Sequence, residues 1–258
     1  MSVWKHLVAV ISAATLAGCA VPPDQAAPPA GSETLHVANA ALAIGDMQEA
    51  ANLYERAAEQ KPGDVEAFIG LGRSYGALGQ SGRAESALQR AIELNSGNPA
   101  PYNELGRIAL NRRDPASAIT YYDKAISRDR RNLAAMTGKA IALDLQSNHA
   151  GAQALYERAL KIYPTNFALL NNKGLSLVLS GRMAEGIAIL EELVSDASRG
   201  ETARANLALA YSIAGRTKDA RAMLTGVLSP SEIGQALRVH SQIRSDLRAG
   251  KPVGHLAF

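Results

Sequence analysis

Six windows of 34 residues follow one another along this chain without an insertion, and side chains of the same size recur at the same positions. The windows begin at Gly31, Val65, Pro99, Leu133, Phe167 and Glu201. Their eighth and twentieth positions hold only Ala or Gly, namely Ala38, Gly72, Gly106, Ala140, Gly174 and Ala208, then Ala50, Ala84, Ala118, Ala152, Gly186 and Ala220. Such a fixed period is the signature of stacked repeats, each of which buries its apolar face against its neighbours. The register therefore predicts an all-α helical solenoid.

Within each window the order of large and small residues resembles the tetratricopeptide repeat, a helix-turn-helix unit. The second window fits this pattern best, with Phe68, Leu71, Gly72, Tyr75, Gly79, Ala84, Leu88 and Ala91. Positions 4, 7, 8 and 11 share one stripe of a helix, and small residues at positions 8 and 20 let the paired helices approach closely. The resemblance implies about six helix-turn-helix repeats over residues 33–234.

The repeats depart from this family pattern at two places. Lys139 and Lys173 replace the apolar residue at position 7, where we expect the aliphatic stems to pack and the ammonium groups to reach water. Leu193 and Val227 replace the small residue at position 27. We therefore expect the last two repeats to pack differently from the others.

A further helix is predicted over residues 229–250, after the sixth repeat. Ser229, Pro230 and Glu232 have the spacing of a capping box with proline in the first turn. One face then carries Ile233, Leu237, His240, Ile243 and Leu247. This helix is expected to cap the solenoid. His240 is interpreted as a packing residue, because no second histidine or carboxylate has metal-ligand spacing.

The first residues follow the pattern of an export signal. A basic start at Lys5 precedes an uncharged run over residues 7–18 and then Cys19, the only cysteine in the chain. The run is too short to cross a hydrocarbon core, which takes about 20 helical residues. The boundary resembles the lipobox of bacterial lipoproteins, in which a diacylglycerol is attached to the cysteine before cleavage, and it reads Leu16-Ala17-Gly18-Cys19.

This second resemblance implies a signal peptide over residues 1–18, followed by a lipidated Cys19 and a Pro-rich tether over residues 19–32. Ala20 stands where an Asp usually marks retention in the inner membrane. We therefore expect an outer-membrane lipoprotein that faces the periplasm. The alternative is an ordinary secretory signal with a coincidental cysteine nearby.

Composition argues against several classes of function. The chain has 27 basic and 24 acidic residues, which are interleaved without a basic block, so nucleic acid is not expected as a partner. Five dispersed histidines, with no His-Glu-x-x-His and no Gly-x-Ser-x-Gly motif, indicate neither a catalytic nor a metal centre. Gly70, Gly72 and Gly76 fall inside a predicted helix and not after a strand, which argues against a nucleotide loop. We expect a protein that is not an enzyme and has no cofactor, metal or small-molecule substrate.

A second stripe of side chains runs along the first helix of each repeat. In the tetratricopeptide family, positions 2, 5, 9 and 12 of that helix line a concave groove that binds partner peptides. The resemblance carries this role to Glu66, Ile69, Arg73, Asn103, Arg107, Leu110, Thr137, Ile141, Asp144, Asn171 and Leu175. Arg and Asn hold a peptide by directed hydrogen bonds, while the apolar members provide buried area. The alternative is that these positions form a solvated surface.

The last third of the chain carries a more specific resemblance. Its segments occur in the order and spacing of one family, and they are Ala142–Leu145, Asn171–Leu177, Ala205–Arg216 and Leu228–Pro230. They resemble the TadD family of the tight-adherence (Flp) pilus assembly system, whose members are described as outer-membrane lipoproteins that assist the secretin or pilus assembly. The resemblance implies a lipid-anchored scaffold whose protein partner is the secretin or another pilus component.

Two alternatives share the same architecture. One is a tetratricopeptide lipoprotein of general envelope assembly, or one that serves cell-wall enzymes, with no tie to pili. The other is a regulatory domain that activates an enzyme in trans. The sequence does not separate the first of these from the pilus role, because a fold of this kind serves many functions.

Overall fold

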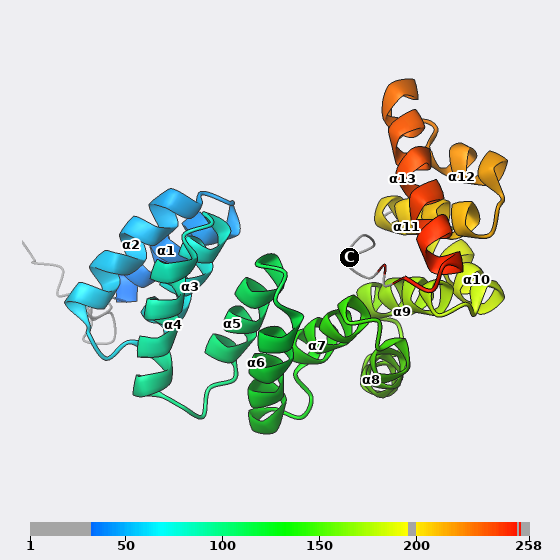
Figure 1. The fold of residues 1–258 in the computed structure, drawn as a ribbon. Helices are drawn as coiled ribbons and strands as arrows, with labels where there is room; N and C mark the ends of the chain where they lie inside the picture. Colours follow the sequence, from blue (N-terminus) through cyan, green and yellow to red (C-terminus); the bar gives the residue numbers. More distant parts are fainter. Residues whose placement is uncertain (1–31, 196–199, 252, 254–258) are drawn as a thin grey trace, which may run out of the picture.

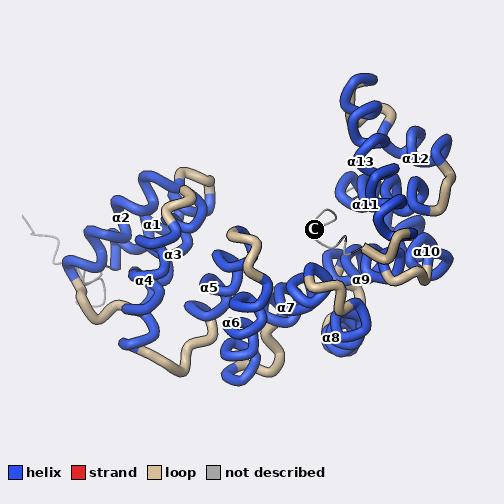
Figure 2. The backbone as a smooth tube through the Cα atoms, viewed as in Figure 1, coloured by secondary structure: helices blue, strands red, loops and turns tan. Residues whose placement is uncertain are grey.

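The structure is a computed structural model that describes residues 32–195, 200–251 and 253, so the predicted signal peptide and Cys19 lie outside the described residues. Within those ranges the chain forms thirteen α-helices and no strand (Figures 1 and 2). Twelve of them form successive pairs: α1 (Ser32–Ala43) with α2 (Met47–Gln60), α3 (Val65–Ala77) with α4 (Ser81–Leu94), α5 (Ala100–Asn111) with α6 (Pro115–Arg128), α7 (Leu133–Leu145) with α8 (His149–Ile162), α9 (Phe167–Leu179) with α10 (Met183–Val194), and α11 (Gly200–Ile213) with α12 (Thr217–Leu224). The last helix is α13 (Pro230–Arg248). The all-α solenoid is confirmed.

Short polar side chains start about half of these helices. An Asp or Asn at the N-cap accepts a hydrogen bond from a backbone N–H of the first turn, which would otherwise have no partner. These N-cap residues are Asp46, Asp64, Asp114, Asn132, Asn148 and Asn166. The helix boundaries are therefore encoded locally, and they recur with the period of the repeat.

Helices pair closely because the two small positions are buried. All twelve Ala and Gly residues at positions 8 and 20 are buried in the structure. In the fifth repeat the approach is closest, because a Cβ on Gly186 would overlap the carbonyl oxygen of Gly174 in the partner helix. Gly70 and Gly72 also have packing roles, since a Cβ on them would overlap the Tyr54 ring and the Leu88 side chain, respectively.

The departures from the family pattern have the expected consequences. The side chains of Lys139 and Lys173 are only 25% and 20% exposed, and their ammonium groups reach Asp123 and Glu157 of the preceding helix. In the sixth repeat α12 ends at Leu224, three residues before position 27, and Val227 lies in the following turn with 37% of its surface exposed. The last repeat therefore packs differently from the first four, in which position 27 is a buried alanine.

Helix α13 packs against α11 and α12, at the end of the stack. Its capping box is formed as predicted: the Ser229 hydroxyl accepts from the Glu232 N–H, and the Glu232 carboxylate accepts from the Ser229 N–H. Ile233 and Ile243 are buried, and half-buried His240 shares a hydrogen bond with the Ser212 hydroxyl over 3.1 Å. Burial lowers the pKa of His240, which fits a packing role.

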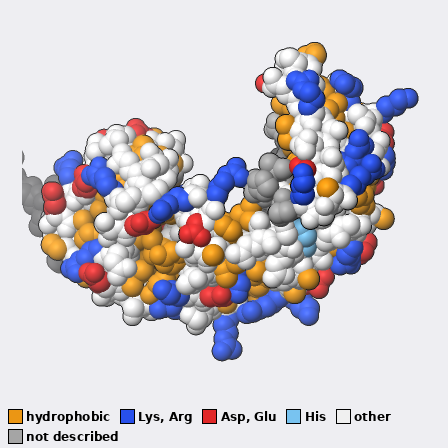
Figure 3. All heavy atoms as spheres, viewed as in Figure 1, with side chains coloured by type: hydrophobic (Ala, Val, Ile, Leu, Met, Phe, Trp, Pro, Cys, Tyr) orange, Lys and Arg blue, Asp and Glu red, His pale blue; other side chains and the backbone are white. Residues whose placement is uncertain are grey.

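The stack of repeats forms an open arc (Figure 1). Its hollow side carries a mixture of apolar, basic and acidic side chains (Figure 3). Among the described residues, no helix combines the length and the apolar character that a membrane span requires.

Candidate protein-interaction site

The structure divides the predicted groove stripe into accessible and buried members. Seven residues keep accessible surface: Glu66, Arg73, Asn103, Arg107, Leu110, Thr137 and Ile141. The other four are buried, with 1% of Ile69, 0% of Asp144, 4% of Asn171 and 1% of Leu175 exposed. For these four, the expected accessible position in the groove is wrong.

The buried members are covered because the first helices of consecutive repeats contact one another. Such contacts join α3 to α5, α5 to α7, α7 to α9 and α9 to α11. A side chain between two of these helices is therefore enclosed, as Leu175 is in the apolar cluster around α9 and α11. The stripe was placed from the geometry of one helix, which does not include this neighbour.

Two arginines from adjacent repeats share one carboxylate in the groove. Arg73 of α3 and Arg107 of α5 each donate through Nε to Glu104, over 2.8 Å in both cases. The Glu104 side chain is only 14% exposed, whereas those of Arg73 and Arg107 are 43% and 39% exposed. Because these bonds use only Nε, the Nη nitrogens remain for a ligand, and the trio carries a net positive charge.

Sequence reasoning missed Glu104. It stands at position 6 of the third repeat, where the second and fourth repeats have glycine. A single acidic residue on this stripe, between the position 9 arginines of adjacent repeats, is a signal that could have identified the ion pair.

The neighbouring side chains shape this cluster. The nearest heavy atom to a Cβ on Gly76 would be the Arg107 Nη2, at 3.0 Å, so the glycine leaves room for the guanidinium. Beneath the cluster, the Tyr122 ring fills the space beside Gly106 and Gly138. Burial is the main cause that raises the pKa of Tyr122, and the nearby Glu104 raises it further. The phenol is therefore neutral across the physiological range.

Two asparagines on the same stripe have an unsatisfied oxygen. Asn103 donates through Nδ2 to Asn132 over 3.1 Å, and Asn171 donates to Asn172 over 3.4 Å. Among the described residues, the Oδ1 atoms of Asn103 and Asn171 are buried and have no hydrogen-bond partner. An unsatisfied buried acceptor costs about 1–3 kcal/mol, so both positions favour a ligand that brings an N–H donor.

A pocket of about 340 Å³ adjoins this polar region between α5 and α7. It is lined by Leu110, Asn111, Arg113, Ile141 and Leu145. Two of these residues, Leu110 and Ile141, belong to the predicted groove. The groove thus combines positive charge, amide groups and an apolar pocket over the second to fourth repeats.

Asp144 has a structural environment instead. Its Oδ1 accepts from the Ser176 hydroxyl over 2.7 Å and contacts His149 Nδ1 at 2.7 Å, and its Oδ2 accepts from the Tyr156 hydroxyl over 3.2 Å. Burial raises the pKa of Asp144, while the hydrogen bonds act in the opposite direction. Ser176 bonds to the carboxylate and not to the imidazole, so the group lacks the arrangement of a nucleophile and its base. Within the described ranges, no cluster of three potential metal ligands occurs.

Comparisons with known families agree with this geometry. Two family models, both for the tetratricopeptide repeat, match residues 41–108, 103–167 and 146–202, so together they span more than half of the chain. The chain is a tetratricopeptide repeat protein. No curated protein matches the sequence at a significant level.

Solved structures of other tetratricopeptide proteins share the fold at low identity. PilW, a widely conserved type IV pilus biogenesis factor, is 19% identical with a TM-score of 0.69, and the match covers 82% of this chain and 100% of PilW. Pseudomonas aeruginosa pilF is 12% identical with a TM-score of 0.65, covering 86% and 97%. YrrB, which has an unusual peptide-binding site, is 16% identical with a TM-score of 0.51, covering 66% and 88%.

Proposed function

We propose that this tetratricopeptide protein is a non-enzymatic scaffold that binds an extended segment of a pilus or secretion component in its concave groove. The observation that carries the proposal is the pair of unpartnered amide oxygens, on Asn103 and Asn171, along the stripe that also holds Arg73 and Arg107. The main chain of an extended peptide presents N–H donors at regular intervals, which these oxygens require. A carboxylate of the segment would meet the free Nη nitrogens of the arginines.

The assignment to a pilus system draws on two sources. The segments of the last third resemble the TadD family, and the fold neighbours PilW and pilF include a type IV pilus biogenesis factor. In the Flp system the partner would be the secretin or an assembly protein beside it. Binding of an envelope protein unrelated to pili in the same groove would instead support the general envelope-assembly role.

The groove is tested by Arg73→Gln combined with Arg107→Gln, which keeps the stems and removes both charges. We expect affinity for the captured pilus component to fall at least about tenfold, because charge-assisted hydrogen bonds are lost. Co-purification from envelope extracts, followed by titration of the purified partner, measures the effect.

Arg90→Gln is the matched control for the groove variant, since Arg90 of α4 pairs only with Glu93 on the same helix. Circular dichroism establishes that the helices remain folded. If the control and the groove variant bind the partner equally well, the concave face is not the binding surface.

The proposal also places the protein at the outer membrane, through a lipid on Cys19. Replacement by Ala removes the only thiol in the chain, so we expect acyl labelling to disappear and the protein to leave the membrane fraction. A Ser12→Ala variant, altered within the signal, serves as the control and should remain membrane-bound. A Cys19→Ala protein that still sediments with the outer membrane would contradict the anchor.

A further inference from the structure

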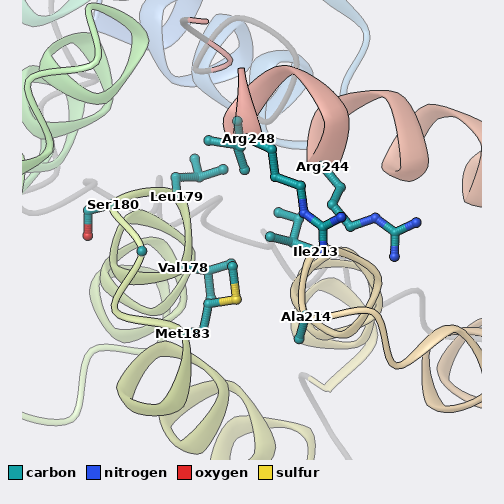
Figure 4. A pocket seen from close by; sticks show the side chains of 10 residues that line it. Val178, Leu179, Ser180, Met183, Ile213, Ala214, Arg244 and Arg248 are labelled. Carbon is teal, nitrogen blue, oxygen red and sulfur yellow. The ribbon is translucent and has the colours of Figure 1, made fainter. Parts of the chain in front are cut away.

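A second pocket, which we call the cap pocket, lies where the C-terminal helix meets the fifth and sixth repeats. It has a volume of about 410 Å³ and lies among the α9–α10 turn, the end of α11 and helix α13. Val178, Leu179, Met183, Ile213 and Leu247 give it an apolar lining. Figure 4 shows Arg244 and Arg248 extending from α13 toward the end of α11. The cap pocket is thus a separate site from the groove residues of α3, α5 and α7.

The cap pocket is positively charged, because its lining includes two arginines and no acidic residue. Arg244 and Arg248 are one helical turn apart on α13, and Arg244 donates through Nη1 to the Ser212 carbonyl over 3.4 Å. Among the described residues, neither guanidinium has a carboxylate within ion-pair distance. Asp246 lies between them in sequence, but it pairs with Lys251 over 3.2 Å.

Nearby arginines show that this absence of neutralisation is local. Arg182, at the start of α10, donates to Glu185 over 2.8 Å, and Arg216, at the start of α12, donates to Asp219 over 2.7 Å. Each of these turns therefore carries its own counter-ion. The charge complementarity of the cap pocket is consequently left for an acidic group from outside the described chain.

We propose that the cap pocket is a second docking site, which binds an acidic segment of a protein partner with a carboxylate next to an aliphatic side chain. The carboxylate pairs with Arg244 and Arg248, and the aliphatic group contacts the apolar lining. A simple anion would use only the charges and leave the apolar volume empty. This site does not depend on the groove or on the identity of the pilus partner.

The test uses the full chain with Arg73→Gln and Arg107→Gln already present, so that the concave groove contributes little. The probe is a short fluorescein-labelled peptide in which glutamates flank leucines, and its twin has glutamines in their place. We expect the acidic peptide to bind at least about tenfold more tightly than its twin, and to lose at least about tenfold when Arg244 and Arg248 both become Gln. Arg238→Gln, on the exposed part of the same helix, should leave binding unchanged.

A second measurement locates the peptide. With 13C-labelled methionine methyl groups, the acidic peptide should shift the signal of Met183, which lines the cap pocket, and not that of Met47 in α2. Equal binding of the two peptides, an unchanged affinity in the double variant, or an unshifted Met183 signal would each overturn the proposal. Displacement by inorganic phosphate at equal concentration would make it a simple anion site, and concentration-dependent dimerisation lost in the double variant would make the occupant a second copy. Either result also overturns it.

Discussion

At the scale of single residues, position 15 of the repeat shows how backbone conformation restricts the choice of side chain. Four repeats place glycine there with φ between 73° and 89°, at Gly45, Gly79, Gly181 and Gly215. The other two place Arg113 and Ser147 at φ of 57° and 60°. The sequence predicts the four glycine turns. It does not reveal that the other two repeats adopt the same left-handed turn, because there the flanking helices impose a conformation that the residue itself disfavours.

This conformational cost predicts stability changes of opposite sign at equivalent positions. Ser147→Gly relieves a left-handed serine and should raise the free energy of unfolding by up to about 1 kcal/mol. Gly181→Ala introduces the same strain and should lower it by about 1 kcal/mol. Urea unfolding followed by circular dichroism measures both variants. If Ser147→Gly destabilises as much as Gly181→Ala does, strain at this position does not govern the turn.

At the scale of the helix, local signals were sufficient and neighbour contacts were not. The capping box at Ser229 and Glu232 involves residues three apart, so the sequence predicts the start of α13 correctly. The groove stripe depends on how a first helix meets the next one, which no local pattern contains. Ile69 and Leu175 therefore lie in the core although their helical positions match the family groove, while Arg73 and Arg107 remain accessible.

At the scale of the whole molecule, stability depends on how strongly each repeat is coupled to the next. The fourth and fifth repeats are joined by buried polar groups in addition to apolar packing. Asp144 of α7 accepts from Ser176 of α9, and Gln153 of α8 donates to Ser180 over 2.9 Å and accepts from Arg182 over 3.2 Å. These hydrogen bonds make the joint specific in geometry, and they make it vulnerable, since losing one partner leaves others buried and unsatisfied.

Removal of the central carboxylate should therefore weaken the coupling between the two halves of the solenoid. Asp144→Ala leaves the Ser176 and Tyr156 hydroxyls without their acceptor, and we expect a loss of about 3 kcal/mol in the free energy of unfolding. We also expect a smaller denaturant slope, because the halves then unfold less cooperatively. Asp123→Ala is the control: it removes the 52%-exposed partner of Lys139 and should cost at most about 1 kcal/mol. Equal losses in the two variants, with unchanged slopes, would show that the buried network does not couple the repeats.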